Sequence, residues 1–64
     1  MSAVSEEWER RETSEELAVV IRLAQEMTQR LAAETHGEMF AEVGELGILL
    51  RKARDKVEYI SAHA

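Results

Sequence analysis

The sequence predicts an all-α protein: an antiparallel two-helix hairpin that dimerises into a four-helix bundle. Three observations carry this prediction. Apolar residues recur at steps of three and four along two long segments, which is the spacing of one face of an α-helix. The 64-residue chain contains no proline and only three glycines, so little interrupts long helices. Gly37 stands between the two segments, where a helix C-terminus and a turn are expected.

The first helix is predicted over about residues 14–34. Thr13 and Glu16 have the spacing of a capping box, which would start the helix at this point. Ser5, followed by two glutamates, is an alternative cap. It would start the helix at residue 5, either continuously or as a short extra N-terminal helix. The choice decides where Trp8 points, because in one unbroken helix it faces away from the apolar stripe.

The turn is predicted at residues 35–37 and the second helix at about residues 38–62. Apolar residues of the second helix alternate in gaps of four and three over about three heptads, the a/d pattern of coiled coils. The first helix shows the same alternation. We therefore expect a packing seam formed by Leu17, Val20, Ile21, Ala24, Met27, Leu31, Met39, Val43, Leu46, Leu50, Ala53, Val57 and Ile60.

The apolar stripes are broader than a contact between two helices requires. Ile21 and Thr28 widen the first stripe, and Phe40 and Leu49 flank the second. The simplest way to cover them is a homodimer of two hairpins, or a hairpin packed on a different helical protein. A chain of this length also has a small stability margin as a monomer, and it has no cysteine for disulfides.

Gly44 and Gly47 lie inside the second predicted helix. Each costs about 1 kcal/mol there relative to alanine, so their presence calls for a reason. They indicate close packing against a partner helix, a local break that makes the helix start at Ile48, or a functional hinge.

Composition narrows the classes of function. The formal charge of −5 and the pI near 4.9 disfavour nucleic acid and anionic membranes as partners, because both attract basic patches. The first residues show no positively charged, apolar signal sequence, and no apolar run approaches the length of about 18 residues that a membrane span needs. We expect a cytoplasmic protein without membrane contact.

No group of residues predicts catalysis, a cofactor or a metal. His36 lies between Glu34 and Glu38, and His63 stands near the end of the chain. None of the glutamates precedes a histidine by three residues, as di-metal bundles require. No nucleophile–histidine set and no glycine-rich phosphate loop is present. We expect no catalytic, cofactor-binding or metal site, and no enzyme.

Two sets of residues are candidates for binding a partner. The basic cluster Arg51, Lys52, Arg54 and Lys56 alternates with acidic residues, as on a solvated helix face. It supports the alternative function, a dimeric helical-bundle regulator that binds RNA. Large side chains outside the seam are candidates for partner contacts; they are Trp8, Ile48 and Tyr59. The function that the sequence favours is a non-catalytic protein–protein interaction module: a small regulator, adaptor or chaperone-like subunit.

Overall fold

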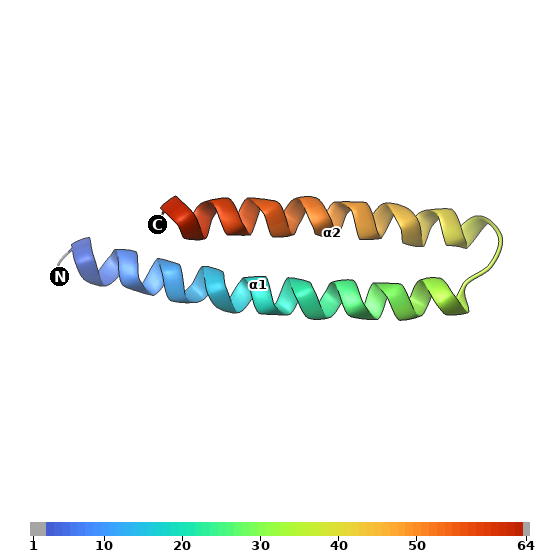
Figure 1. Ribbon diagram of the computed structural model, residues 1–64, viewed down its shortest axis with the longest axis horizontal. Coiled ribbons are helices and arrows are strands. Elements are labelled where there is room, and N and C mark those ends of the chain that lie inside the picture. Colours follow the sequence, from blue (N-terminus) through green and yellow to red (C-terminus); the bar gives the residue numbers. More distant parts are fainter. Residues whose placement is uncertain (1–2, 64) are drawn as a thin grey trace.

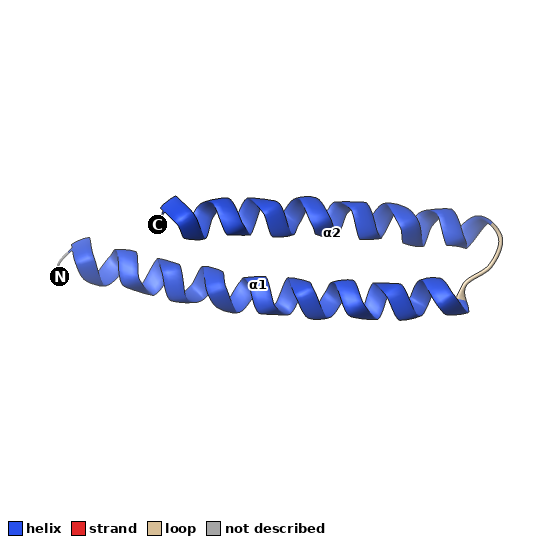
Figure 2. Cartoon of the chain, in the orientation of Figure 1, coloured by secondary structure: helices blue, strands red, loops and turns tan. Residues whose placement is uncertain are grey.

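The chain folds into two long α-helices that lie side by side and run in opposite directions (Figure 1). A computed structural model describes residues 3–63, and side chains from residue 6 onward. Helix α1 spans Ala3–Glu34 and helix α2 spans Glu38–His63. The hairpin measures 53 × 14 × 14 Å, and Figure 2 shows that its described part is helix apart from the connecting turn. The predicted all-α hairpin is confirmed.

The turn between the helices forms where glycine permits a left-handed backbone. Gly37 has a φ of 72°, a region that residues with a Cβ atom rarely adopt. The N–H of Thr35 donates a 3.3 Å hydrogen bond to the carbonyl of Ala32, and the N–H of Phe40 donates a 3.1 Å bond to the carbonyl of Gly37. These two bonds close the end of α1 and open α2, so the reversal takes only a few residues.

Helix α1 is continuous through the position at which the capping box would start it. Thr13 lies in the helix interior, and the helix begins at Ala3. The hydroxyl of Ser14 donates a 2.9 Å hydrogen bond back to the carbonyl of Arg11, a pattern that a helix accommodates within its own turns. The expected extra N-terminal helix is therefore the first part of α1, and Trp8 remains 65% exposed.

Helix α2 is also continuous, because Gly44 and Gly47 both lie within it. The two helices differ in length, and the N-terminal part of α1 extends past the end of α2 (Figure 1). Ser14 lies opposite Ser61. About nine residues of α1, some 13 Å of helix, therefore continue beyond the last residue of α2.

The hydrophobic core of the hairpin is thin. Its buried apolar residues are Ile21, Val43 and Val57, and none of the large described side chains is fully buried. Folding stability depends mainly on apolar area removed from water. The contact between the two helices therefore supplies little of the burial that a small domain needs.

Candidate interaction surface

The contact between the helices consists mostly of small and polar residues. Its members follow one another in steps of four and three along each helix, the spacing of antiparallel coiled-coil packing. We call this set the interhelix seam; it comprises Ser14, Ala18, Ile21, Gln25, Thr28 and Ala32 from α1, and Val43, Gly47, Leu50, Arg54, Val57 and Ser61 from α2.

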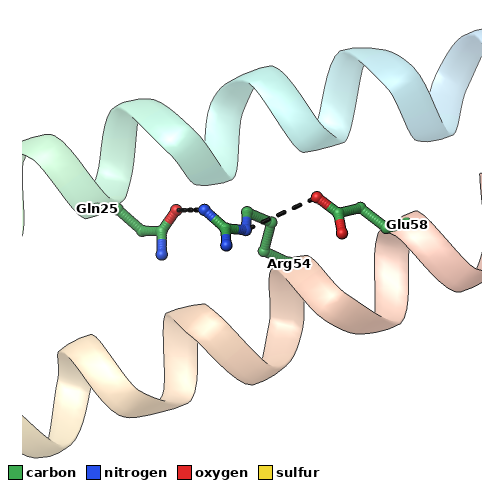
Figure 3. A network of polar contacts seen from close by, with 3 residues as sticks. All are labelled: Gln25, Arg54 and Glu58. Carbon is green, nitrogen blue, oxygen red and sulfur yellow. Dashed lines mark hydrogen bonds and ion pairs between the residues drawn. The ribbon is translucent and has the colours of Figure 1, made fainter.

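Polar pairs bridge the seam near one end and at its middle. The hydroxyls of Ser14 and Ser61 are 2.7 Å apart. Because the Ser14 proton is directed to the carbonyl of Arg11, Ser61 is the donor in this pair. In Figure 3, Nη1 of Arg54 reaches across to Oε1 of Gln25 at 3.4 Å, and its Nε lies 3.7 Å from Oε1 of Glu58.

These pairs specify how the two helices align. Sliding one helix by a turn would leave Ser14, which is only 7% exposed, without its partner across the seam. It would also remove the amide oxygen that the Arg54 guanidinium contacts. Burying a polar group without a partner costs about 1–3 kcal/mol. The seam is thus better suited to setting the register than to supplying hydrophobic stabilisation.

Gly47 brings the helices close at the middle of the seam. An alanine Cβ built at this position would lie 4.0 Å from Cγ2 of Thr28, an ordinary van der Waals contact. At Gly44 such a Cβ would meet nothing within 4 Å. Of the two glycines, Gly47 is therefore the one that contacts the opposite helix.

Apart from Ile21 and Leu50, the larger apolar side chains lie outside the seam, and many of them lie directly beside it. Seven of the fourteen exposed large apolar residues precede a seam residue by one position, which turns them about 100° around the helix axis. Leu17 of α1 and Ile60 of α2 line one surface hollow together with Val57, so the stripes of both helices open on the same side. We call this surface the apolar face; it comprises Leu17, Val20, Ala24, Met27 and Leu31 from α1, and Met39, Leu46, Leu49, Ala53 and Ile60 from α2.

The opposite side of the hairpin is more polar. A hollow there is lined by Gln29 of α1 and by Gly44, Ile48 and Arg51 of α2. The helical repeat places Arg22 in line with Gln29, and Glu58 in line with Arg51. The two broad sides of the hairpin therefore differ in character: most residues of one side are large and apolar, with Glu42 and Lys56 among them on α2, and the other side is more polar.

The structure divides the thirteen predicted seam residues between these two surfaces. Ile21, Val43, Leu50 and Val57 lie in the interhelix seam. The other nine lie on the apolar face, where their large side chains are between 42% and 61% exposed. The seam members that sequence reasoning missed are small or polar. Their four–three spacing is regular, but a search for apolar periodicity does not detect it.

The three predicted partner-contact residues are exposed but lie apart from one another. Trp8 lies on the part of α1 that extends past α2, beside Arg11 and Glu12. The ring of Tyr59 stacks on His63 with centroids 4.2 Å apart. Ile48 belongs to the polar side, about 30 Å along the helix axis from Trp8 by helical rise. The described structure does not join them into one surface.

The basic cluster of α2 is similarly dispersed. Arg54 is engaged in the seam with Gln25 and Glu58, and Arg51 lines the hollow on the polar side. Lys56 precedes the seam residue Val57, which places it on the side of the apolar face, and Lys52 is exposed farther around α2. Four cations on different sides of a helix do not form one continuous basic surface.

Residues 3–63 contain no group of three or more histidine, cysteine or acidic side chains arranged to hold a metal ion. Within the same range, neither helix is long and apolar enough to cross a membrane. Comparison of the chain with protein families, with curated proteins and with solved structures gave no match.

Proposed function

We propose that this chain is a non-catalytic protein–protein interaction module, a small helical regulator, adaptor or chaperone-like subunit that acts through its apolar face. The observation that carries the proposal is the placement of the large apolar side chains. Eight of the fourteen exposed large apolar side chains lie on the apolar face, which spans both helices, while mostly small and polar residues occupy the contact between the helices. Contiguous exposed apolar surfaces of this kind mark interaction sites.

The exposed area supports the same proposal. The chain has a solvent-accessible surface of 5373 Å², whereas a compact monomer of this mass exposes about 4,200 Å². The excess, roughly 1,200 Å² per chain, exceeds the area of about 800 Å² that one partner contributes to a standard interface. If two chains each covered this excess, their interface would fall in the size range of obligate homodimers.

A second copy of this chain is the partner we propose. Two hairpins packed through their apolar faces form a four-helix bundle, in which each stripe contacts another amphipathic helix. In a twofold dimer the same residues of both copies form the interface, so the two apolar faces have equal length. The alternative is that a different helical protein covers the same face. The experiment below distinguishes that alternative from the homodimer.

The experiment is sedimentation equilibrium on the full chain at micromolar concentration, with a matched pair of variants. Leu46 and Ile48 lie two residues apart on α2 and are 42% and 56% exposed; Leu46 belongs to the apolar face and Ile48 to the polar side. We expect the parent chain and Ile48→Asp to sediment as dimers. We expect Leu46→Asp to sediment as a monomer, because it places a charge inside the interface.

A folded parent monomer of 7.3 kDa would overturn the homodimer. If Ile48→Asp and Leu46→Asp dissociated equally, the assignment of the interface to the apolar face would be wrong. Far-ultraviolet circular dichroism of each variant separates loss of association from loss of the hairpin.

A further inference from the structure

Four charged residues of α2 surround Leu49 at the outer edge of the apolar face. Glu45 and Lys52 are its neighbours on the helix surface, four residues before it and three after it, and Glu42 and Lys56 stand seven residues to either side. All four are exposed, and within the described side chains none of them forms an ion pair. Acidic residues thus precede Leu49, and basic residues follow it at matching distances.

This order of charges does not stabilise the hairpin itself. Glu42 and Glu45 are three residues apart, and Lys52 and Lys56 are four apart, so neighbouring side chains carry like charges. Like charges at such spacing destabilise an isolated helix. The helix dipole does not compensate, because its effect is confined to the first and last turns, and α2 runs from residue 38 to residue 63. Opposite charges from a partner would stabilise both clusters.

A second copy of α2 supplies those charges in a matching order. Suppose that two α2 helices cross antiparallel, with Leu49 at the level of the partner's Leu49. Glu42 then lies level with the partner's Lys56, and Glu45 lies within one residue of the level of the partner's Lys52. A twofold dimer contains both pairs twice. The same alignment covers the apolar residues, because Leu49 lies within one residue of the middle of residues 39–60, the extent of the apolar face on α2.

The sizes of the apolar side chains fit this alignment as well. Within each copy, the hairpin register fixes which positions of α1 lie level with those of α2. In the antiparallel crossing, Ala53 comes within one residue of the level of the partner's Leu46, and Ala24 comes within one residue of the level of the partner's Met27. Small side chains thus meet large ones, the alternation that fills a core without voids.

The other face-to-face arrangement has both turns at the same end of the bundle. There α2 lies across the partner's α1, at levels that the hairpin register fixes. Glu45 comes level with the partner's Arg30, but Glu42 comes within one residue of the level of the partner's Glu34. The alanines of the apolar face meet each other, so small side chains lie against small ones.

The two lysines distinguish the arrangements further. With the turns at the same end, Lys52 lies level with the partner's Leu23, and Lys56 lies three residues from the level of the partner's Glu16. With the turns at opposite ends, both lysines lie within one residue of the level of a glutamate, although Glu34 comes within two residues of the level of the partner's Glu16. All four charges around Leu49 are paired at their own level only in the arrangement with turns at opposite ends.

We propose that α2 lies across the partner's α2 in the homodimer, with the twofold axis at Leu49, and that Glu42, Glu45, Lys52 and Lys56 determine this pairing. The proposal rests on the homodimer proposed above and adds its alignment. It also gives a reason for a second copy as the partner, because the order of charges is complementary to itself, and complementary potentials select one partner and one orientation over others.

Charge reversal tests the pairing. Lys52→Glu/Lys56→Glu makes all four positions acidic, and Glu42→Lys/Glu45→Lys makes all four basic. In sedimentation equilibrium, each variant alone should dimerise on the order of a hundredfold more weakly than the parent, because four attractive pairs become repulsive. An equimolar mixture should regain the affinity of the parent as a heterodimer, since every acidic position then meets a basic one.

The matched control is Arg22→Glu/Arg51→Glu. It changes the net charge by the same amount as the double lysine reversal, but on the polar side of the hairpin. It should dimerise like the parent. Far-ultraviolet circular dichroism checks the hairpin in each variant, and a reversal variant that loses helicity alone should regain it in the mixture.

The mixture separates failure of the alignment from failure of the homodimer. If α2 lay across the partner's α1, the mixed dimer would contain one contact of each kind, and its affinity would be the average of the two variants. That result, or reversal variants that dimerise as tightly as the parent, would overturn the alignment and leave the homodimer intact. A parent that sediments as a monomer would overturn the homodimer itself.

Single cysteines locate the axis, because the chain has none of its own. An axis at Leu49 places the thiol of Leu49→Cys beside its own copy, whereas the thiols of Ala53→Cys are eight residues apart along the bundle, about 12 Å. Under mild oxidation at micromolar concentration, Leu49→Cys should form the disulfide-linked dimer on the order of a hundredfold faster, because facing thiols have an effective concentration of about millimolar. Equal rates, or faster cross-linking of Ala53→Cys, would show that the axis lies elsewhere.

Discussion

Replacing Gly44 by alanine tests two assignments at once: that α2 is helical at this position, and that no partner covers the polar side of the hairpin. Gly44 lies in the interior of a continuous helix, and a Cβ at this position would meet no heavy atom within 4 Å. Replacing glycine by alanine in a helix interior favours folding by about 0.5–1 kcal/mol, because the unfolded glycine has more conformations to lose. No steric cost offsets this gain in the hairpin. We therefore expect Gly44→Ala to stabilise the protein by that amount.

Thermal unfolding followed by circular dichroism at 222 nm measures the effect. A gain of 1 kcal/mol raises the Tm by about 4–8 °C for a domain of this size. All variants must be compared at one protein concentration, since association shifts the apparent stability. Gly37→Ala is the control of opposite sign, because its φ of 72° costs a residue with a Cβ about 1–2 kcal/mol.

A lower Tm for Gly44→Ala would refute this reasoning. The added methyl group would then have to meet an atom that the single chain does not contain. Such a contact would place a partner on the polar side and contradict the assignment of the interface to the apolar face. An unchanged Tm would show that α2 is not helical at this position in solution.

The remaining predictions concern the interhelix seam. Leu50 is half-buried in the seam, so Leu50→Asp places a charge there and should lower the free energy of unfolding by several kcal/mol. Both the helicity and the mass of the assembly in solution should fall. A variant with the ellipticity and mass of the parent would show that the seam register is wrong. Ser14→Ala leaves the Ser61 hydroxyl without its partner and should lower the free energy of unfolding by about 1 kcal/mol. In urea titrations, the double variant Ser14→Ala/Ser61→Ala should lose less free energy of unfolding than the two single variants lose together. Additive losses would show that the two hydroxyls do not interact in solution.

Local features of the chain were sufficient to predict the secondary structure. The turn at Gly37 follows from one residue's tolerance of a left-handed backbone, and the helices follow from periodicity and the absence of proline. The start of α1 was less well determined. Both Ser5 and Thr13 fit the pattern of a cap, and a capping sequence does not stop a helix when the residues before it are also compatible with one.

The sequence by itself determined that this protein is a helical hairpin with one broad apolar stripe on each helix, because periodicity depends only on residue order. Only the tertiary structure decided which side of each helix faces the other. Ser14, Gln25, Gly47 and Arg54 have no apolar signal, yet they form the contact because small side chains allow close approach and polar pairs satisfy each other across it. The larger apolar residues, such as Leu46, are consequently turned outward.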